Sequence, residues 1–217
     1  MVISLKEKLH DSAQSIVIAL DGASASGKGR IGRMIAKKFD LEYVESGKSY
    51  RSLAYLCIQK EIDPLDADSI IKLIKDDILG IPSDVDLNHE EIAIYASKIS
   101  ILPEVREAIT LNLMNKINTT KRILMEGRDI GTVVAPNADL KIFITASPEV
   151  RAERRYKQLK SEGKDCMLEN VLNSIIERDK RDSSRSVAPL KAAHDAIVID
   201  TSSRTPDQVL DTILKFV

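Results

Sequence analysis

The stretch from residue 16 to residue 36 constrains the fold more than any other part of the chain, because its three parts require three consecutive local structures. Residues 16–20 form an unbroken apolar run rich in β-branched side chains, which is too short for a helix and favours a strand buried on both faces. A segment of Gly, Ser and Ala follows, and Ile31, Met34 and Ile35 then recur at helical spacing. We therefore predict a buried parallel strand, a small-residue loop and a helix.

The loop of this unit has the composition and spacing of a phosphate-binding loop. Gly22 and Gly27 are separated by four residues and Lys28 follows directly, as in the P-loop pattern, although Gly29 stands where the strict pattern has Ser or Thr for magnesium. Small side chains let backbone N–H groups close around an anion, and the helix N-terminus adds partial positive charge. The alternative is an ordinary turn joining a strand to a helix. The flanking strand and helix favour phosphate binding.

Composition limits the other classes of protein that the chain can belong to. A length of 217 residues, 43% of them hydrophobic and 30% charged, predicts one well-buried domain with at most a small insert. The net charge of −1 gives no reason to expect nucleic acid as the main partner. Cys57 and Cys166 belong to no CxxC motif and no secretory leader is visible, so we expect reduced thiols and a cytoplasmic location. No apolar run reaches about 18 residues, so we expect no membrane partner.

Four further short apolar runs predict strands at residues 41–44, 122–125, 140–144 and 196–199. Between them, periodicity and capping signals predict helices at 49–60, from Pro64 to Ile78, after a capping box at Asn88 and Glu91, from Pro103 to about Asn118, from Pro148, and after a capping box at Thr205 and Gln208. Residues 45–48 are expected to form a turn. Strands alternating with helices predict an α/β fold, a five-stranded parallel sheet with helices on both faces and a ligand crevice at the carboxyl ends of the strands.

Charged residues at the carboxyl ends of the strands are candidates for chemistry. Glu126 directly follows the third predicted strand, where it could hold the water ligands of Mg²⁺; the alternative is a surface ion pair. Residues 151–191 contain eleven Lys or Arg and seven Asp or Glu. We expect Arg154 and Arg155 to close over a triphosphate and neutralise charge that develops during transfer, the alternative being a solvated helix. A second mixed-charge cluster at residues 178–185 could equally be helical ion pairing.

Several motifs in order along the chain resemble the bacterial cytidylate kinase (CMP/dCMP kinase) family of P-loop nucleoside monophosphate kinases. They are residues 20–29, Ser46-Gly47 with Tyr50-Arg51, residues 103–108, Gly127-Arg128-Asp129-Ile130-Gly131-Thr132-Val133-Val134, and Arg178-Asp179-Lys180-Arg181-Asp182 with residues 185–190. The last two are the most specific to that family. The resemblance implies phosphorylation of CMP and dCMP to CDP and dCDP in pyrimidine metabolism, with ATP and Mg²⁺, by a monomer. It also implies one domain over 1–217, with its core at 16–60, 101–150 and 167–217, an NMP-binding insert at about 61–100 and a lid at about 151–166.

The resemblance and the loop together give a set of candidate site residues. The loop residues Gly22, Ala23, Ser24, Ala25, Ser26, Gly27, Lys28, Gly29 and Arg30 are expected to bind ATP. The resemblance implies that Ser24, Arg51, Arg128 and Arg185 hold the acceptor phosphate, that Ser97, Arg106 and Asp129 read the cytosine, and that Ser46, Arg178 and Asp182 complete the nucleotide site. The candidates for catalysis are Lys28, Arg128, Arg154, Arg155 and Arg185.

Three features depart from the pattern of the family. Arg30 replaces a small hydroxyl residue, residues 45–49 differ from the usual Asp-Ser/Thr-Gly-Ala, and the insert is short. We expect the Arg30 side chain to point to solvent, because an inward guanidinium would crowd a loop of Gly, Ala and Ser. A kinase for another nucleoside monophosphate and a nucleotide-binding switch stay as alternatives. The switch is disfavoured because the chain has no Asn-Lys-x-Asp motif and because its arginines suit a second phosphate site.

Overall fold

The computed structural model describes residues 4–75, 85–87 and 89–217. Its elements in chain order are α1 (Leu5–His10), β1 (Ile16–Gly22), α2 (Lys28–Phe39), β2 (Glu42–Glu45), α3 (Ser46–Gln59), α4 (Ala67–Lys75), α5 (Glu90–Ile99), α6 (Pro103–Thr119), β3 (Arg122–Gly127), the π-helix η2 (Ile130–Val134), β4 (Leu140–Thr145), α7 (Pro148–Ser161), α8 (Leu168–Ser183), β5 (Ile197–Asp200) and α9 (Pro206–Leu214). They form two compact units, one of residues 1–44 with 119–217 and one of residues 45–118. Within the described ranges, no helix combines the length and the apolar character that crossing a membrane requires.

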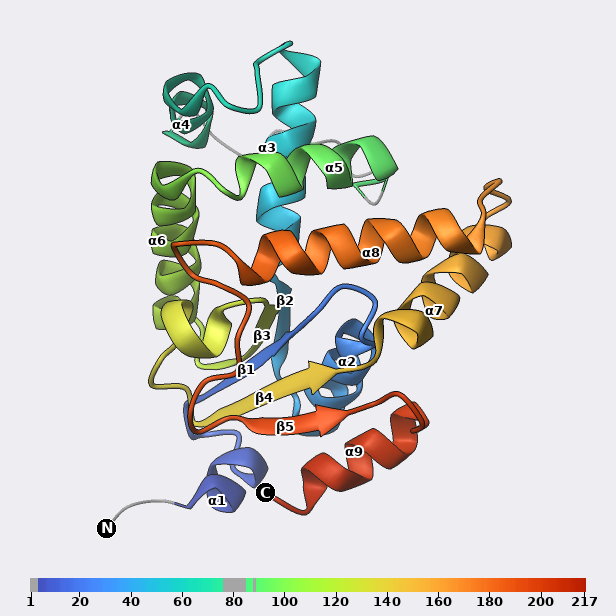
Figure 1. Ribbon diagram of the computed structural model, residues 1–217. Coiled ribbons are helices and arrows are strands. Elements are labelled where there is room, and N and C mark those ends of the chain that lie inside the picture. The colour runs from blue at the N-terminus through green and yellow to red at the C-terminus, as the bar shows by residue number, and fades with distance from the viewer. Residues whose placement is uncertain (1–3, 76–84, 88) are drawn as a thin grey trace. The chain divides into compact units, whose positions relative to one another are not determined.

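The first unit is built on a five-stranded sheet with the order β2-β3-β1-β4-β5 (Figure 1). β1 pairs in parallel with β3 and with β4, and β4 pairs in parallel with β5. The register places Leu20 opposite both Glu126 and Ile142, so the carboxyl ends of the three central strands lie at one edge of the sheet. The prediction of a five-stranded parallel sheet with flanking helices is confirmed.

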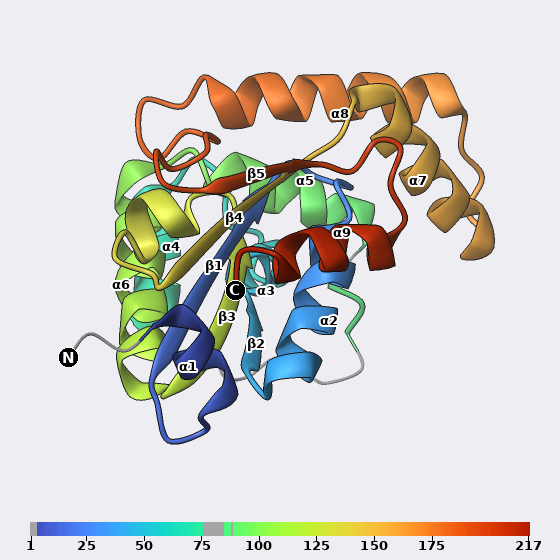
Figure 2. The same ribbon diagram turned by 90° about the horizontal axis from the view of Figure 1, so that it is seen from below.

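The central strands are covered on both faces, as the apolar run at residues 16–20 predicts. Ile18 and Leu20 belong to a buried cluster that continues through α2 and α9, and Figure 2 shows these two helices side by side. Because side chains alternate along a strand, Asp21 of β1 points to the opposite face. There it meets η2, whose Gly131 also lies against Lys141 of β4. Asp21, near the end of the buried strand β1, is therefore directed toward η2, which follows β3 in the chain.

Arg122, at the start of β3, ties the N-terminal helix α1 to the sheet. Its guanidinium donates hydrogen bonds to the carbonyls of Lys8, Asp11 and Gln14 through Nη1, and to those of Leu9 and Phe39 through Nη2. The carbonyls at the ends of α1 and α2 have no partner within their helices, so one cation satisfies several of them at once. α1 was not predicted from the sequence, although Ser4 and Glu7 form a capping box.

The second unit is helical, with α3 packed against both α4 and α5. Leu53, Cys57, Ile70 and Ile99 are buried in this unit. It contains the whole expected insert, residues 61–100, and the proposed division into core, insert and lid stays a prediction.

Several expected element boundaries in the second unit were wrong. The turn expected at residues 45–48 is wrong, because α3 already begins at Ser46. The next helix begins at Ala67 and not at Pro64, because residues 61–66 form turns with hydrogen bonds of their own. The capping role expected for Asn88 and the helix end expected at Ile78 lie outside the described residues.

Candidate functional site

The loop between β1 and α2 has a backbone shape that its small residues permit. Gly22 has φ +155°, and a Cβ atom there would lie 2.2 Å from the carbonyl oxygen of Ile144, so no other residue fits. Gly27 caps α2 with φ +92°, a left-handed conformation that glycine adopts without strain. The Ser26 hydroxyl is buried, and it has no hydrogen-bond partner among the residues that the structure describes. These features make a tight, polar loop in front of a helix N-terminus, as an anion site requires.

Lys28 is the first residue of α2 and is only 8% exposed. Its Nζ lies 3.4 Å from the carbonyl oxygen of Ala23, on the opposite arm of the loop. Burial, followed by repulsion from the Arg128 guanidinium, lowers the pKa of Lys28 to about 7. A negatively charged ligand would strongly stabilise the charged form of this poorly solvated amine, because the ligand supplies the opposite charge.

Glu126, near the end of β3, lies beside the start of the same helix. Its Oε2 accepts a 2.6 Å hydrogen bond from the Tyr43 hydroxyl, and a Cβ at Gly29 would come within 3.3 Å of that oxygen. Within the described part of the chain no cluster of three or more His, Cys, Asp or Glu side chains could hold a metal ion. Mg²⁺ commonly binds through one or two carboxylates together with phosphates and water, and Glu126 fits that mode.

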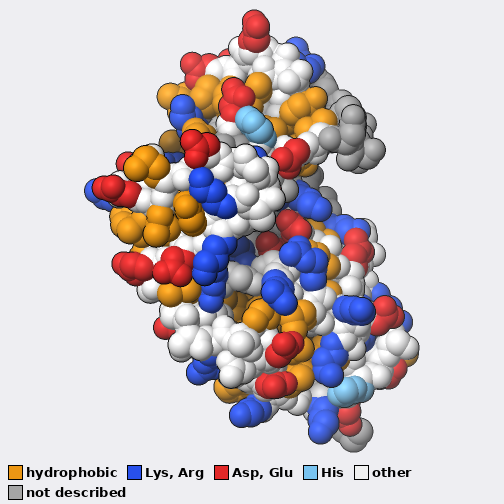
Figure 3. Space-filling view, turned by 90° about the vertical axis from the view of Figure 1, so that its right-hand side faces the viewer, with side chains coloured by type: hydrophobic (Ala, Val, Ile, Leu, Met, Phe, Trp, Pro, Cys, Tyr) orange, Lys and Arg blue, Asp and Glu red, His pale blue; other side chains and the backbone are white. Residues whose placement is uncertain are grey.

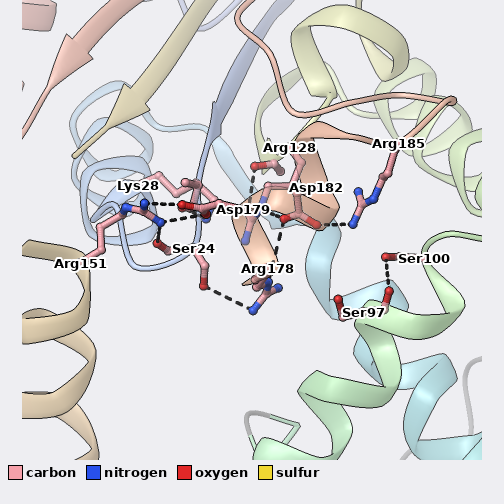
Figure 4. Close-up of polar contacts among 12 residues, drawn as sticks. Ser24, Lys28, Ser97, Ser100, Arg128, Arg151, Arg178, Asp179, Asp182 and Arg185 are labelled. Carbon is pink, nitrogen blue, oxygen red and sulfur yellow. Dashed lines mark hydrogen bonds and ion pairs between the residues drawn. The ribbon is translucent and has the colours of Figure 1, made fainter. Parts of the chain in front are cut away.

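Three arginines surround one buried carboxylate on α8. Asp182 is 2% exposed; Nε of Arg128 lies 3.5 Å and Nε of Arg178 lies 4.0 Å from its Oδ2, while Arg185 forms an ion pair with its Oδ1 (Figure 4). We call these four residues the arginine cluster. One carboxylate cannot neutralise three guanidinium groups, so the cluster keeps an excess of positive charge. Arginines whose spacing is fixed in this way are suited to a phosphate, which accepts several N–H donors together.

The arginine cluster is connected to the loop through Ser24. Arg178 donates a 3.3 Å hydrogen bond to Oγ of Ser24, and Arg151 of α7 donates one of 3.3 Å to its carbonyl oxygen. Arg151 also forms a two-point ion pair with Asp179 of α8. Arg151 and Asp179 were not among the site residues predicted from the sequence; the available signals were the Arg-Asp pair at 178–179 and a second arginine three residues before Arg154.

The two arginines expected to close over a triphosphate have different surroundings. Arg154 donates hydrogen bonds to the carbonyl oxygen of Ser26 (3.2 Å) and to Oγ1 (3.0 Å) and the carbonyl oxygen (2.6 Å) of Thr201. Burial lowers the pKa of Arg154. Arg155 is half-buried on the same helix, and among the described residues it forms no hydrogen bond or ion pair with the loop. Arg30 is exposed. The parts that these residues play in catalysis stay predictions.

Asp21 fixes the segment that carries Arg128 and Asp129. Its carboxylate accepts hydrogen bonds from the backbone N–H groups of Ile130 (2.9 Å) and Gly131 (2.8 Å) at the start of η2. Burial raises the pKa of Asp21 to about 6, although these two bonds oppose the shift. Asp129 immediately precedes η2 and is buried. No motif in the sequence indicated that Asp21 would bind these two amides.

The second unit carries the remaining candidates. Arg106 is buried and donates a 3.2 Å hydrogen bond to the carbonyl oxygen of Ser100, whose hydroxyl in turn donates to the carbonyl oxygen of Ser97. The Arg106 guanidinium also lies 5.7 Å from the ring centre of Tyr50, within the range of a cation–π contact. Ser46 is buried in the first turn of α3, and Arg51 forms a 3.4 Å ion pair with Glu45. Within its own unit, Arg106 is therefore held in a defined orientation.

Comparison with known proteins gives one consistent result. Residues 18–217 match the family model described as cytidylate kinase. The chain is 55% identical over 214 residues to a cytidylate kinase of Rickettsia bellii (strain OSU 85-389), covering 99% of this chain and 98% of that protein. It is 51% identical over 216 residues to one of Rickettsia akari (strain Hartford), covering 100% and 98%. Among solved structures, a gluconokinase from Sinorhizobium meliloti 1021 has a TM-score of 0.51 at 14% identity over 93% of this chain and 90% of that one, which shows the fold alone.

Proposed function

The chain belongs to the cytidylate kinase family, and from this membership we propose that it transfers the γ-phosphoryl group of ATP to CMP and dCMP, reversibly, forming CDP and dCDP. The observation that carries the proposal is the arginine cluster linked through Ser24 to the phosphate loop. Two anion sites joined at one residue suit a reaction that brings two phosphates together.

The loop is the proposed donor site. Its amides and the N-terminus of α2 would hold the ATP phosphates, and Lys28 would stabilise negative charge that develops on the transferred group. Glu126 would hold water ligands of Mg²⁺, which supplies positive charge to the triphosphate when it is bound. Arg154, bound to Ser26 and Thr201, would border the same site.

The arginine cluster is the proposed acceptor site for the phosphate of CMP. Arg128, Arg178 and Arg185 would bind that phosphate, and Asp182 would keep their guanidinium groups in place. Asp129, Arg106 and Ser97 would read the base. The exocyclic amino group of cytosine can donate a hydrogen bond to a carboxylate, and its ring acceptors can receive hydrogen bonds from Arg or Ser. Uracil lacks the amino donor.

A coupled assay of ADP formation tests this proposal with a panel of nucleoside monophosphates. CMP and dCMP should be the efficient acceptors, and AMP and GMP should be poor ones. Equal kcat/KM values for AMP and CMP would contradict the assignment and support the alternative of a kinase for another monophosphate. A nucleotide-binding switch is the other alternative; the arginine cluster argues against it, because a switch has no acceptor phosphate to bind.

The proposed partners are small nucleotides, with no nucleic acid and no membrane. On the face drawn in Figure 3 basic and acidic side chains are interspersed, which supports this proposal because nucleic-acid binding uses extended basic surfaces.

We also propose a monomer in the cytoplasm, where the unpaired thiols of Cys57 and Cys166 would stay reduced. Light scattering of the purified protein tests the oligomeric state.

A further inference from the structure

Two arginines on one face of α7 bind the phosphate loop from outside. Arg151 donates to the carbonyl oxygen of Ser24, and Arg154, one turn later, donates to that of Ser26. A peptide unit is planar and trans, so its C=O and N–H groups point in opposite directions. When the carbonyls of Ser24 and Ser26 point toward α7, the N–H groups of the following residues, Ala25 and Gly27, must point away from it.

Arg151 is itself held too firmly to act as a mobile side chain. It is 3% exposed, and its Nε donates a 2.9 Å hydrogen bond to the carbonyl oxygen of Ala146, just after β4. Its two terminal nitrogens bind both oxygens of Asp179 on α8. One guanidinium thus joins the end of β4, the phosphate loop and α8, and only the planar fork of an arginine supplies donors in all three directions.

We infer that Arg151, anchored by Asp179, is a positioning residue that orients the amides of the donor loop toward the phosphates of ATP. Arg154 gives the same orientation two peptides further along, supported by the buried Thr201. The first turns of α7 then belong to the fixed frame of the donor site, and the proposed lid would move only beyond Arg154. The inference rests on the proposed function in one respect, namely that ATP is the anion in the loop.

The test measures equilibrium binding of ATP by calorimetry, without CMP, to the variants Arg151→Lys and Asp179→Asn. Lysine keeps the positive charge but cannot reach Ala146, Ser24 and Asp179 together. Asparagine keeps the shape of Asp179 but loses its charge. Each variant should raise the Kd for ATP by roughly tenfold, the effect of losing one charge-assisted hydrogen bond. The double variant should be no weaker than Arg151→Lys within about twofold, because both changes interrupt one connection.

The matched control is Lys157→Gln on the same helix, where a 78% exposed side chain pairs only weakly with Glu153; its Kd should equal that of the unaltered protein. A role confined to stability predicts a lower melting temperature with an unchanged Kd for ATP, and that result would overturn the inference. If Arg151→Lys does not fold, Asp179→Asn decides the question, because the Asp179 side chain is 25% exposed and its replacement is isosteric.

Failure of the proposed function would give a different pattern from failure of this inference. A protein that binds ATP but does not phosphorylate CMP contradicts the function and leaves the ATP-binding comparison valid. A protein without measurable affinity for ATP contradicts both.

Discussion

The Tyr43 hydroxyl donates a 2.6 Å hydrogen bond to Oε2 of Glu126, across neighbouring strands of the sheet. The Tyr43 ring is fixed in turn, because Gly32 of α2 leaves room for it and Arg33 lies over its face at 5.6 Å. Tyr43 therefore orients the carboxylate that we propose as the holder of magnesium-bound water.

Removing this hydroxyl should weaken the use of magnesium. In Tyr43→Phe, the Mg²⁺ concentration that gives half the maximal rate at fixed ATP should rise by roughly tenfold, because groups that orient a metal-binding carboxylate affect metal affinity on that scale. A magnesium titration of the kinase rate measures it. Tyr156→Phe on α7 is the control and should not change the titration. An unchanged magnesium requirement in Tyr43→Phe would show that Glu126 keeps its place without Tyr43.

Lys28 should take up a proton when ATP binds. Its pKa is about 7 in the protein without ligand, so at pH 8 most molecules carry a neutral amine. Phosphates raise the pKa of a nearby amine, and binding therefore charges it and weakens as pH rises above 7. Calorimetry at pH 8 in two buffers of different ionisation enthalpy measures the uptake. Lys28→Ala should abolish it and lower kcat by roughly 10²-fold or more. The same uptake in Lys28→Ala would assign the proton to another group.

Asp21→Ala should destabilise the first unit more than its small loss of volume suggests. The change leaves the N–H groups of Ile130 and Gly131 buried without their acceptor, at about 1–3 kcal/mol each. Urea unfolding should show a free energy of unfolding lower by about 2–6 kcal/mol. Asp21→Asn keeps one acceptor oxygen and should lose less. Equal losses in the two variants would mean that the volume of the side chain matters and not its hydrogen bonds.

Asp129→Ala should raise KM for CMP and leave KM for ATP nearly unchanged, because the proposed contact is with the cytosine base alone. Initial rates with each substrate varied in turn separate the two constants. A parallel rise of both constants would indicate that Asp129 supports the structure and does not read the base.

Arg30→Thr should keep the activity or raise it modestly, since the Arg30 side chain is exposed and the shorter hydroxyl could restore a contact with phosphate. Steady-state kinetics with ATP as the varied substrate measures this effect, and KM for ATP should fall if that contact forms. A large loss of kcat would instead make Arg30 a phosphate ligand.

The parts that could be predicted from the sequence depend on short-range signals. The apolar run at 16–20, the glycines at 22 and 27 and the periodic helix after them predicted β1, the loop and α2, and later apolar runs located the other strands. The resemblance to cytidylate kinases, which rested on motifs such as residues 127–134, is confirmed by the family model.

The rest depends on contacts between residues far apart in the chain. Asp21 binds amides more than a hundred residues away, and Arg151 and Arg122 bind backbone carbonyls, which every residue possesses and no pattern identifies. The helical start of α3 at Ser46 was missed for a different, local reason. Gly47 argued for a turn, but the helix leaves it beside Arg51, where a Cβ would come within 3.0 Å of the Arg51 guanidinium.

The strand order has a consequence for synthesis on the ribosome. β1 pairs with β3 and β4, so its first partner, Arg122 opposite Ile16, is made only after the whole second unit. At ordinary elongation rates, β1 therefore has no strand to pair with for roughly 5–20 seconds. Residues 45–118 are continuous in the chain and can complete their own contacts in that time. The nascent chain therefore has a period in which its helical unit can fold while β1 has no strand to pair with.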